Sequence, residues 1–233
     1  MNGFRDRHVV VTGGTGALGT AVVGKLIEAG AICHVPYLHE EEAKRFPHST
    51  HKSVSLTALG NLADEAAVTS YYEGLSSLWA SIHIAGGFAF APIETSDKAL
   101  LMGQVETNLV SAYLCCRAAV QAMRRGGSGR IVNVAARPAL EPRQGASMTA
   151  YTAAKGAVAA LTVALGEEVA KDGILVNAVA PSIMDTPTNR KSMPKADYAA
   201  WPKVEEVAAT IVFLASPQNA VTRGAIVPVY GKS

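Results

Sequence analysis

Cysteine, charge and long apolar runs are all scarce in this chain. Its three cysteines are odd in number and two are adjacent, which argues against a disulfide framework and favours a reduced, cytoplasmic setting. Charged residues make up only 17%, and a net charge of +2 provides no basic surface for nucleic acid. The longest apolar runs fall well short of the about 18 residues that cross a bilayer, so no membrane span is expected.

Linkers, leaders and metal ligands are scarce as well. No stretch rich in Gly, Ser or Pro divides the chain, so residues 1–233 are interpreted as a single domain. The first residues lead directly into a strand pattern, without the regions of a signal peptide. His48 and His51 share a polar segment without a third ligand nearby, so no metal site is expected.

What the chain does have is a regular alternation of apolar runs and helical segments. Seven short runs rich in Val and Ile predict strands, at residues 7–13, 31–37, 52–56, 79–86, 129–135, 174–180 and 224–230. Helical periodicity lies between them, at residues 18–30, 64–75, 102–125, 150–173 and 204–216. This pattern predicts an α/β fold, a Rossmann-type doubly wound parallel sheet of seven strands with helices on both faces. Ligands of such sheets bind beyond the carboxyl ends of the strands.

A glycine-rich turn, TGGTGALG at residues 12–19, separates the first predicted strand from the first helix. Gly13 and Gly19 allow a tight turn and a close backbone approach, and amides at the start of the helix can meet a pyrophosphate. A nucleotide site is therefore predicted here, formed by Gly13, Thr15, Gly16, Ala17, Leu18 and Gly19.

The second predicted strand ends at Tyr37, without the Asp or Glu that commonly binds the adenosine ribose of NAD. The glutamates at residues 40–42 follow late enough to be interpreted as the solvated start of a helix. His39, Lys44 or Arg45 could instead meet a 2′-phosphate, although each is also a typical surface residue. The choice between NAD and NADP stays open, with a slight preference for NADPH.

Tyr151 and Lys155 stand four residues apart near the start of the predicted helix from residue 150. At that spacing their side chains leave the same face of the helix. A nearby ammonium stabilises a phenolate and lowers a tyrosine pKa from its usual value of about 10. Tyr151 is therefore a candidate proton donor near neutral pH.

Together these motifs resemble the short-chain dehydrogenase/reductase family over essentially the whole chain. TGGTGALG, AGG at residues 85–87, ETNLVSAY, YTAAK and APSIMDTP occur in the family's order. The resemblance implies an NAD(P)-dependent oxidoreductase that acts on a small molecule and assembles as a homodimer or homotetramer.

The resemblance also implies roles for individual residues. Tyr151 would be the catalytic acid/base, Lys155 would hold the ribose and lower the pKa of Tyr151, and Asn108 would support a water-linked proton path to Lys155. The implied cofactor contacts outside the first turn are Tyr37, Asn61, Leu62, Ala85, Gly86, Gly87, Tyr151, Lys155, Pro181, Ser182, Ile183 and Thr186. Of these, Asn61 and Leu62 would flank the adenine, and Ile183 and Thr186 would hold the nicotinamide carboxamide.

The chain departs from the family pattern at its catalytic serine. Aligning GRIVNVAA on the fifth strand places Ala136 at that position. Ser147 and Thr149 are near in sequence, but each is equally typical of a loop residue or a helix cap. The other departures are Ala17 for a glycine, residues 83–86 reading HIAG for NNAG, and Ser182 for a glycine.

One branch of the family matches better than the family as a whole. DTPTNRKSMPKADYAAW at residues 185–201 resembles the dihydropteridine reductases, which also carry Ala in place of the serine. Their substrate, a quinonoid dihydropterin, is a conjugated imine that spreads developing charge over its ring, so one proton donor can suffice. The resemblance thus implies hydride transfer from NAD(P)H to such a heterocycle, with Tyr151 as proton donor.

The same segment is expected to form a substrate-facing lid. Residues 189–202 are polar and follow the sixth predicted strand, although a plain surface loop is the alternative. Met193, Tyr198 and Trp201 could stack on a flat heterocycle or fill a core instead.

Two other functions remain open from the sequence. A general short-chain reductase could act on another carbonyl or quinone, with Ser147 or backbone groups in place of the serine. A non-catalytic nucleotide-binding sensor is the second alternative, although it would need neither Tyr151 nor Lys155. Small residues expected on exposed helix faces, for close packing between subunits, are Ala112, Cys115, Ala119, Ala157 and Ala160. The physiological substrate and the choice between dimer and tetramer are likewise left open.

Overall fold

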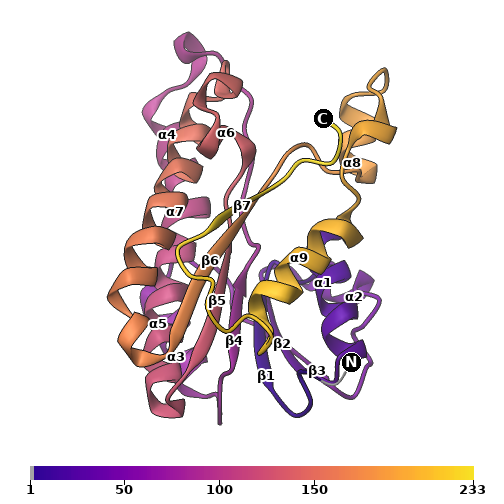
Figure 1. Cartoon of the computed structure of the whole chain (residues 1–233). Helices are drawn as coiled ribbons and strands as arrows, with labels where there is room; N and C mark the ends of the chain where they lie inside the picture. The colour runs from indigo at the N-terminus through magenta and orange to yellow at the C-terminus, as the bar shows by residue number, and fades with distance from the viewer. Residues whose placement is uncertain (1–2) are drawn as a thin grey trace.

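Seven parallel strands in one sheet form the centre of the computed structural model, which describes residues 3–233 (Figure 1). The strands are β1 (His8–Thr12), β2 (Ile32–Tyr37), β3 (Val54–Ala58), β4 (Ala80–His83), β5 (Gly129–Val134), β6 (Ile174–Pro181) and β7 (Ile226–Val229). Their order across the sheet is β3-β2-β1-β4-β5-β6-β7, and every neighbouring pair is parallel. The predicted doubly wound sheet is confirmed, with the third strand two residues later than expected.

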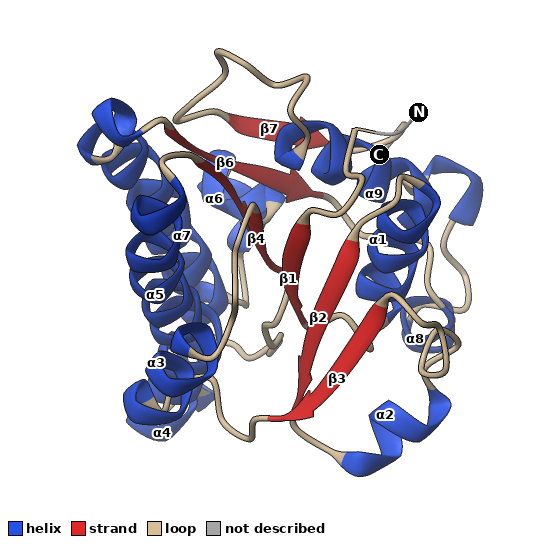
Figure 2. Cartoon of the chain, turned by 90° about the horizontal axis from the view of Figure 1, so that it is seen from below, coloured by secondary structure: helices blue, strands red, loops and turns tan. Residues whose placement is uncertain are grey.

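Helices cover both faces of this sheet. Figures 1 and 2 show α3 (Glu65–Glu73), α5 (Ser111–Gly126) and α7 (Thr149–Glu168) on one face, and α1 (Ala17–Glu28) and α9 (Val204–Ala215) on the other. Four short helices lie between the main elements, α2 (Glu40–Arg45), α4 (Lys98–Gln104), α6 (Arg137–Leu140) and α8 (Pro187–Ser192). Single 3₁₀ turns occur at Ile93–Thr95, Pro142–Gly145, Ala170–Asp172 and Tyr198–Ala200.

The apolar runs became strands because both faces of the sheet are buried. Side chains alternate across a strand, so Val9 and Val11 lie in the core under α1 and α9, while Val10 lies in the core on the opposite face. Leu26 belongs to the first of these clusters and Met123 to the second. Such two-sided burial explains why the strands read as continuous apolar runs.

Part of the expectation about exposed small residues is wrong. Ala112, Cys115 and Ala119 are at most 6% exposed and pack inside the chain rather than on its surface. Cys115 and Ala119 lie on the α5 face that contacts the sheet and α3. The outward face of α5 carries Tyr113, which is 53% exposed, and the outward face of α7 carries Val163, which is 50% exposed.

The helix predicted over residues 102–125 contains a change of helical type. It consists of α4, a π-helical turn at Val105–Val110, and α5. Asn108 lies in this turn and is 1% exposed. A π turn widens the helix by one residue and is common at functional sites. Hydrophobic periodicity over so short a stretch does not distinguish it from α-helix.

Five buried polar side chains form a hydrogen-bonded chain that crosses the core from α3 to α7. Tyr72 Oη lies 2.8 Å from Ser81 Oγ, which lies 2.8 Å from His83 Nε2. His83 Nδ1 is 2.8 Å from Asn133 Oδ1, and Asn133 Nδ2 donates to Thr162 Oγ1 at 2.9 Å. Because β4 and α7 both contribute to this chain, it fixes the strand end at residues 84–87 relative to the helix that carries Tyr151.

The direction of each proton in this chain follows from its last member. The Thr162 hydroxyl donates to the Val158 carbonyl at 2.8 Å, so its oxygen accepts from the Asn133 amide nitrogen. The Asn133 carbonyl oxygen then faces His83, whose Nδ1 must donate to it. His83 Nε2 is left as the acceptor for Ser81. Burial lowers the pKa of His83 to about 4, so the ring is neutral near pH 7.

Candidate active site

The turn between β1 and α1 depends on two glycines. Gly13 has a φ of +68°, and a Cβ there would lie 2.6 Å from the Ala85 backbone nitrogen. A Cβ on Gly19 would collide with the Gly13 carbonyl oxygen. Neither position accepts a side chain, so the backbone of the turn packs directly against the strand end after β4.

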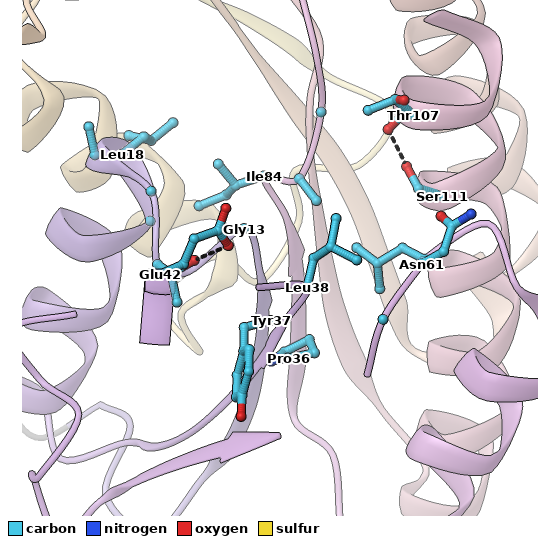
Figure 3. Close-up of a pocket in the computed structure, with 18 residues that line it drawn as sticks. Gly13, Leu18, Pro36, Tyr37, Leu38, Glu42, Asn61, Ile84, Thr107 and Ser111 are labelled. Atoms are coloured by element: carbon cyan, nitrogen blue, oxygen red, sulfur yellow. Dashed lines mark hydrogen bonds between the residues drawn. The ribbon is translucent and has the colours of Figure 1, made fainter. Parts of the chain in front are cut away.

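A cavity of about 400 Å³ opens beside this turn, at the carboxyl ends of the strands (Figure 3). Its lining includes these predicted cofactor residues: Gly13, Thr15, Gly16, Ala17, Leu18, Gly19, Tyr37, Asn61, Leu62, Ala85 and Gly86. Lining residues that sequence reasoning did not assign to a cofactor are Pro36, Leu38, Glu42, Gly60, Ile84, Thr107 and Ser111. Leu38, Gly60 and Ile84 follow β2, β3 and β4 within two residues, so the position of strand ends was the signal that could have found these three.

The cavity fits a dinucleotide. The N-cap residue of α1 is Gly16, which has no side chain to compete for the first amides of the helix. Those amides, together with the positive end of the helix dipole, form a place for a diphosphate. The close packing at Gly13 and Gly19 also lets a ligand approach the backbone.

The other predicted residues lie outside this cavity, at the continuation of the same sheet edge. Pro181 ends β6 and is buried, and Ile183 is 45% exposed. Thr186 is the N-cap of α8 and accepts a hydrogen bond from the Asn189 amide at 3.1 Å. Ser182 donates its hydroxyl to the Tyr230 carbonyl at 2.9 Å. The hydroxyls of Ser182 and Thr186 thus each make a hydrogen bond to a backbone group of the chain.

Lys155 is a buried cation. Its side chain is 5% exposed, and Nζ donates to the Val134 carbonyl at 2.7 Å. Burial lowers its pKa to about 8, because the charged form loses hydration that one carbonyl only partly replaces. Val134 ends β5, so this bond ties α7 to the carboxyl edge of the sheet.

Tyr151 lies one helical turn before Lys155 and is covered by an aromatic ring. The Phe88 ring meets the Tyr151 ring edge to face, with 5.0 Å between their centroids. Burial raises the pKa of Tyr151 to about 12. The lowering expected from the Tyr–Lys spacing does not appear, because the shift is caused by loss of water around the phenol, which disfavours the phenolate. Tyr151 is fully protonated at neutral pH.

Asn108 holds the loop after β4. Its Oδ1 accepts from the Gly87 amide at 3.2 Å, and its Nδ2 donates to the carbonyls of Gly87 and Gln104, both at 3.0 Å. A Cβ on Gly86 would lie 2.7 Å from Asn108 Oδ1 and 3.3 Å from Lys155 Nζ. Asn108 and Lys155 therefore approach Gly86 together, while the water-linked path between them stays a prediction.

Residues near Ala136 do not simply replace the missing hydroxyl. Ala136 is 5% exposed and begins α6 as its N-cap. Thr149 is exposed at the start of α7. Ser147 has a φ of +61°, rare for a residue with a side chain, and its carbonyl accepts from the Ala91 amide at 2.8 Å. The Ser147 backbone thus lies against the loop carrying Phe88.

The expected lid is held by contacts within itself. Arg190 pairs with both carboxylate oxygens of Asp185, at 2.6 and 2.8 Å, and its guanidinium lies 4.7 Å from the centre of the Tyr198 ring. The Tyr198 hydroxyl donates to the carbonyls of Arg190 and Met193. Trp201 is only 8% exposed. It therefore fills the interior, which is one of the two alternatives that the sequence left open.

Sequence comparison identifies the family. Residues 7–197 match the sequence model of the short chain dehydrogenases. The chain belongs to the short-chain dehydrogenase family. It is an oxidoreductase of this family, with the fold and the glycine-rich turn already described.

Members of the short-chain dehydrogenase family align with nearly the whole chain. The chain is 32% identical to cis-4-hydroxycyclohexanecarboxylate dehydrogenase of Sinomonas cyclohexanicum, covering 98% of this chain and 96% of that protein. It is 28% identical to levodione reductase of Leifsonia aquatica, covering 98% and 94%. Among solved structures, gox2181 superposes with a TM-score of 0.90 at 27% identity, covering 98% and 95%. ElxO with NADP bound superposes with a TM-score of 0.88 at 24% identity, covering 97% and 98%.

Within residues 3–233, no helix has the length and apolar character to cross a membrane. The same part of the chain contains no group of three or more His, Cys, Asp or Glu side chains placed to hold a metal ion.

Proposed function

We propose that this short-chain dehydrogenase reduces a quinonoid dihydropterin, or a similar conjugated heterocycle, with NAD(P)H as the hydride donor. The observation that carries the proposal is Ala136, which is buried where the family has a hydroxyl. The resemblance of residues 185–201 to dihydropteridine reductases points to the same class of substrate.

The nucleotide site is proposed for the cavity beside the first turn. The turn at residues 13–19 and the start of α1 would hold the diphosphate, and Asn61 and Leu62 would flank the adenine. Ile183 and Thr186 would meet the nicotinamide, and Lys155 the ribose. The ElxO structures, described with NADP and with NADPH bound, support the use of NAD(P)H. When bound, the reduced nicotinamide supplies the hydride.

Tyr151 is proposed as the proton donor because it is protonated at neutral pH and lies beside Lys155. The conjugated C=N system of the substrate takes up the hydride, and the phenol of Tyr151 gives one proton to the developing anion. Three N–H groups are available on Lys155 Nζ and one goes to Val134, which leaves charge and donors to stabilise the phenolate. The anion that forms is delocalised over the ring, so a second hydroxyl donor at residue 136 is not needed.

The test follows NADH and NADPH oxidation while quinonoid dihydropterin is generated in the assay. The wild-type chain should turn over, and Tyr151→Phe should lose about 10²- to 10⁴-fold in kcat, because Phe keeps the ring but not the proton. Turnover unchanged in Tyr151→Phe would show that the proton comes from elsewhere. Binding of the nucleotide without any turnover would favour the non-catalytic sensor.

A general short-chain reductase is the second candidate, and Ser147 is the observation that favours it. Its left-handed backbone and its contact with the Ala91 amide place a hydroxyl-bearing residue against the loop that carries Phe88. Two of the relatives, cis-4-hydroxycyclohexanecarboxylate dehydrogenase and levodione reductase, are named for a ring alcohol and a dione. In this case Ser147→Ala should abolish activity on a simple ketone, which the first proposal does not expect.

We also propose that the chain, as one domain, forms a homodimer or homotetramer through the outward faces of α5 and α7. Tyr113 and Val163 give these faces apolar side chains that are about half exposed. Large apolar side chains exposed on a soluble chain commonly mark contacts between proteins. The choice between dimer and tetramer requires a mass measurement in solution.

A further inference from the structure

The nucleotide cavity contains a carboxylate that the end of β2 does not supply. Glu42 lies on α2 and lines the cavity together with Thr15, Tyr37 and Leu38. The Thr15 hydroxyl donates to Glu42 Oε2 at 3.3 Å, which turns the carboxylate toward the glycine-rich turn (Figure 3). Glu42 thus lies at the start of a helix, as expected, but it is only partly solvated and faces the cavity.

The two glutamates beside Glu42 have different surroundings. Glu40 accepts a hydrogen bond from the Tyr37 hydroxyl at 2.9 Å. Glu41 pairs with Lys44 at 2.9 Å, and its carbonyl accepts from Arg45 Nε at 2.9 Å. The two cations are therefore engaged beside Glu41, and both lie outside the cavity lining. Of the charged residues on α2, Glu42 is the one that borders the cavity.

The place of Glu42 matches one part of a dinucleotide. In this fold the adenosine ribose lies beyond the end of the second strand, next to the turn after the first. Thr15 belongs to that turn and Tyr37 ends β2, so the Thr15–Glu42 contact borders the ribose 2′ position. A carboxylate there accepts a hydrogen bond from a 2′-hydroxyl. It repels a 2′-phosphate, whose charge is close to −2 at neutral pH.

We infer that Glu42 discriminates against the 2′-phosphate of NADPH, with Thr15 holding its carboxylate in place. The inference rests on the proposed nucleotide site but is independent of the substrate. It gives α2 the specificity role that a carboxylate at the end of the second strand commonly has.

Nucleotide binding, measured without substrate, tests this directly. Dissociation constants for NADH and NADPH are determined by nicotinamide fluorescence for the wild-type chain and for Glu42→Gln, which keeps the side-chain size. The Kd ratio of NADPH to NADH should fall about tenfold in Glu42→Gln, because the like-charge repulsion is removed. Raising the salt concentration should shrink the difference between the two proteins. Glu41→Gln is the matched control and should leave the ratio within about twofold, as expected of an exposed ion pair.

Two further variants keep the test decisive. Glu42→Asp retains the charge and should retain most of the discrimination, even if Glu42→Gln folds poorly. Thr15→Arg combined with Glu42→Gln should bind NADPH more tightly than Thr15→Arg alone, where the new arginine would pair with Glu42. An unchanged Kd ratio in both Glu42→Gln and the double variant would overturn the inference. If the wild-type chain binds neither NADH nor NADPH, the proposed nucleotide site itself is wrong.

Discussion

At the scale of single residues, Lys155 and Tyr151 have pKa values displaced in opposite directions. Burial lowers the pKa of Lys155 to about 8 and raises that of Tyr151 to about 12. Between these values the phenol keeps its proton while the ammonium loses its charge. The pair is therefore best matched to proton donation below pH 8.

This predicts the pH dependence of reduction. The kcat/KM for the reduced substrate should be level from about pH 6 and should fall above about pH 8, as Lys155 is deprotonated. In Lys155→Arg the charge persists, so the fall above pH 8 should disappear even if the rate is lower. A wild-type profile that stays level to about pH 10 would contradict the role of Lys155 charge.

Gly13 allows a second prediction at this scale. Gly13→Ala places a Cβ at a φ of +68° and 2.6 Å from the Ala85 nitrogen. It should lower the free energy of unfolding by about 2 to 5 kcal/mol and weaken nucleotide binding. Gly103→Ala, on α4 with no neighbouring atom within 4 Å of the new Cβ, is the control and should gain about 0.5 to 1 kcal/mol. Urea unfolding measures the free energy of unfolding of both variants. Equal changes in Gly13→Ala and Gly103→Ala would contradict the prediction.

Some site residues could be predicted from the sequence and others could not. The glycine-rich turn follows the first strand directly, and the rule that ligands lie beyond strand ends finds it. Asn61 and Ala85 are implied only by the family resemblance. Glu42 follows β2 by five residues, and only the path of the chain returns it to Thr15. The pKa of Tyr151 is raised by burial, and the Phe88 ring that packs against it comes from a different part of the chain.

At the scale of elements, the chain from Tyr72 to Thr162 joins β4 and β5 to helices on one face of the sheet. Its central member, His83, is 3% exposed and has a pKa near 4, against about 6.5 in an unfolded chain. The unfolded state therefore binds a proton between pH 6.5 and 4 that the folded state does not. The contribution of His83 to the free energy of unfolding is fully present above pH 6.5 and is lost as the pH falls toward 4.

Between pH 6.5 and pH 4, the titration of His83 should lower the free energy of unfolding by about 3 kcal/mol. His34, whose pKa burial also lowers to about 4, adds a loss of the same sign. The measurement is therefore the difference between the wild-type chain and His83→Asn in urea unfolding at about pH 7 and pH 4.5. The variant should be less stable at pH 7 and should lose less on acidification. Parallel losses in both proteins would contradict a neutral, buried His83.

Element boundaries show where periodicity stops being informative. The seven strands were predictable because burial on both faces leaves long apolar runs. The helices α2, α6 and α8 have at most six residues, too few for a repeat of 3.6 to show. The apolar pattern predicts ordinary helix over the π turn at Val105–Val110, because one extra residue per turn hardly changes that pattern.

At the scale of the whole molecule, the order of strands places the site. The chain starts at β1 in the middle of the sheet, proceeds outward to β3, and then crosses back to β4. Loops after β1 and β4 therefore diverge to opposite faces and leave a crevice between them, as is general for doubly wound sheets. The cavity beside Gly13 lies at this point, between elements far apart in sequence.

The proposed assembly gives a prediction at this scale. Val163→Glu and Tyr113→Glu each put a charge on the outward face of α7 or α5 and should shift the mass measured by light scattering toward the monomer. Phe213→Glu, at a site that is 50% exposed on α9 and so on the opposite face of the sheet, is the matched control and should leave the mass unchanged. A monomeric wild-type chain, or equal masses for all variants, would contradict an interface on α5 and α7.

The most direct test of the central claim compares two substrates in one protein. Initial rates of NADH and NADPH oxidation are measured with quinonoid dihydropterin and with a simple cyclic ketone. Because Ala136 offers no hydroxyl to a localised alkoxide, kcat/KM for the dihydropterin should exceed that for the ketone by at least about 100-fold. Equal or faster reduction of the ketone would contradict the proposed substrate class.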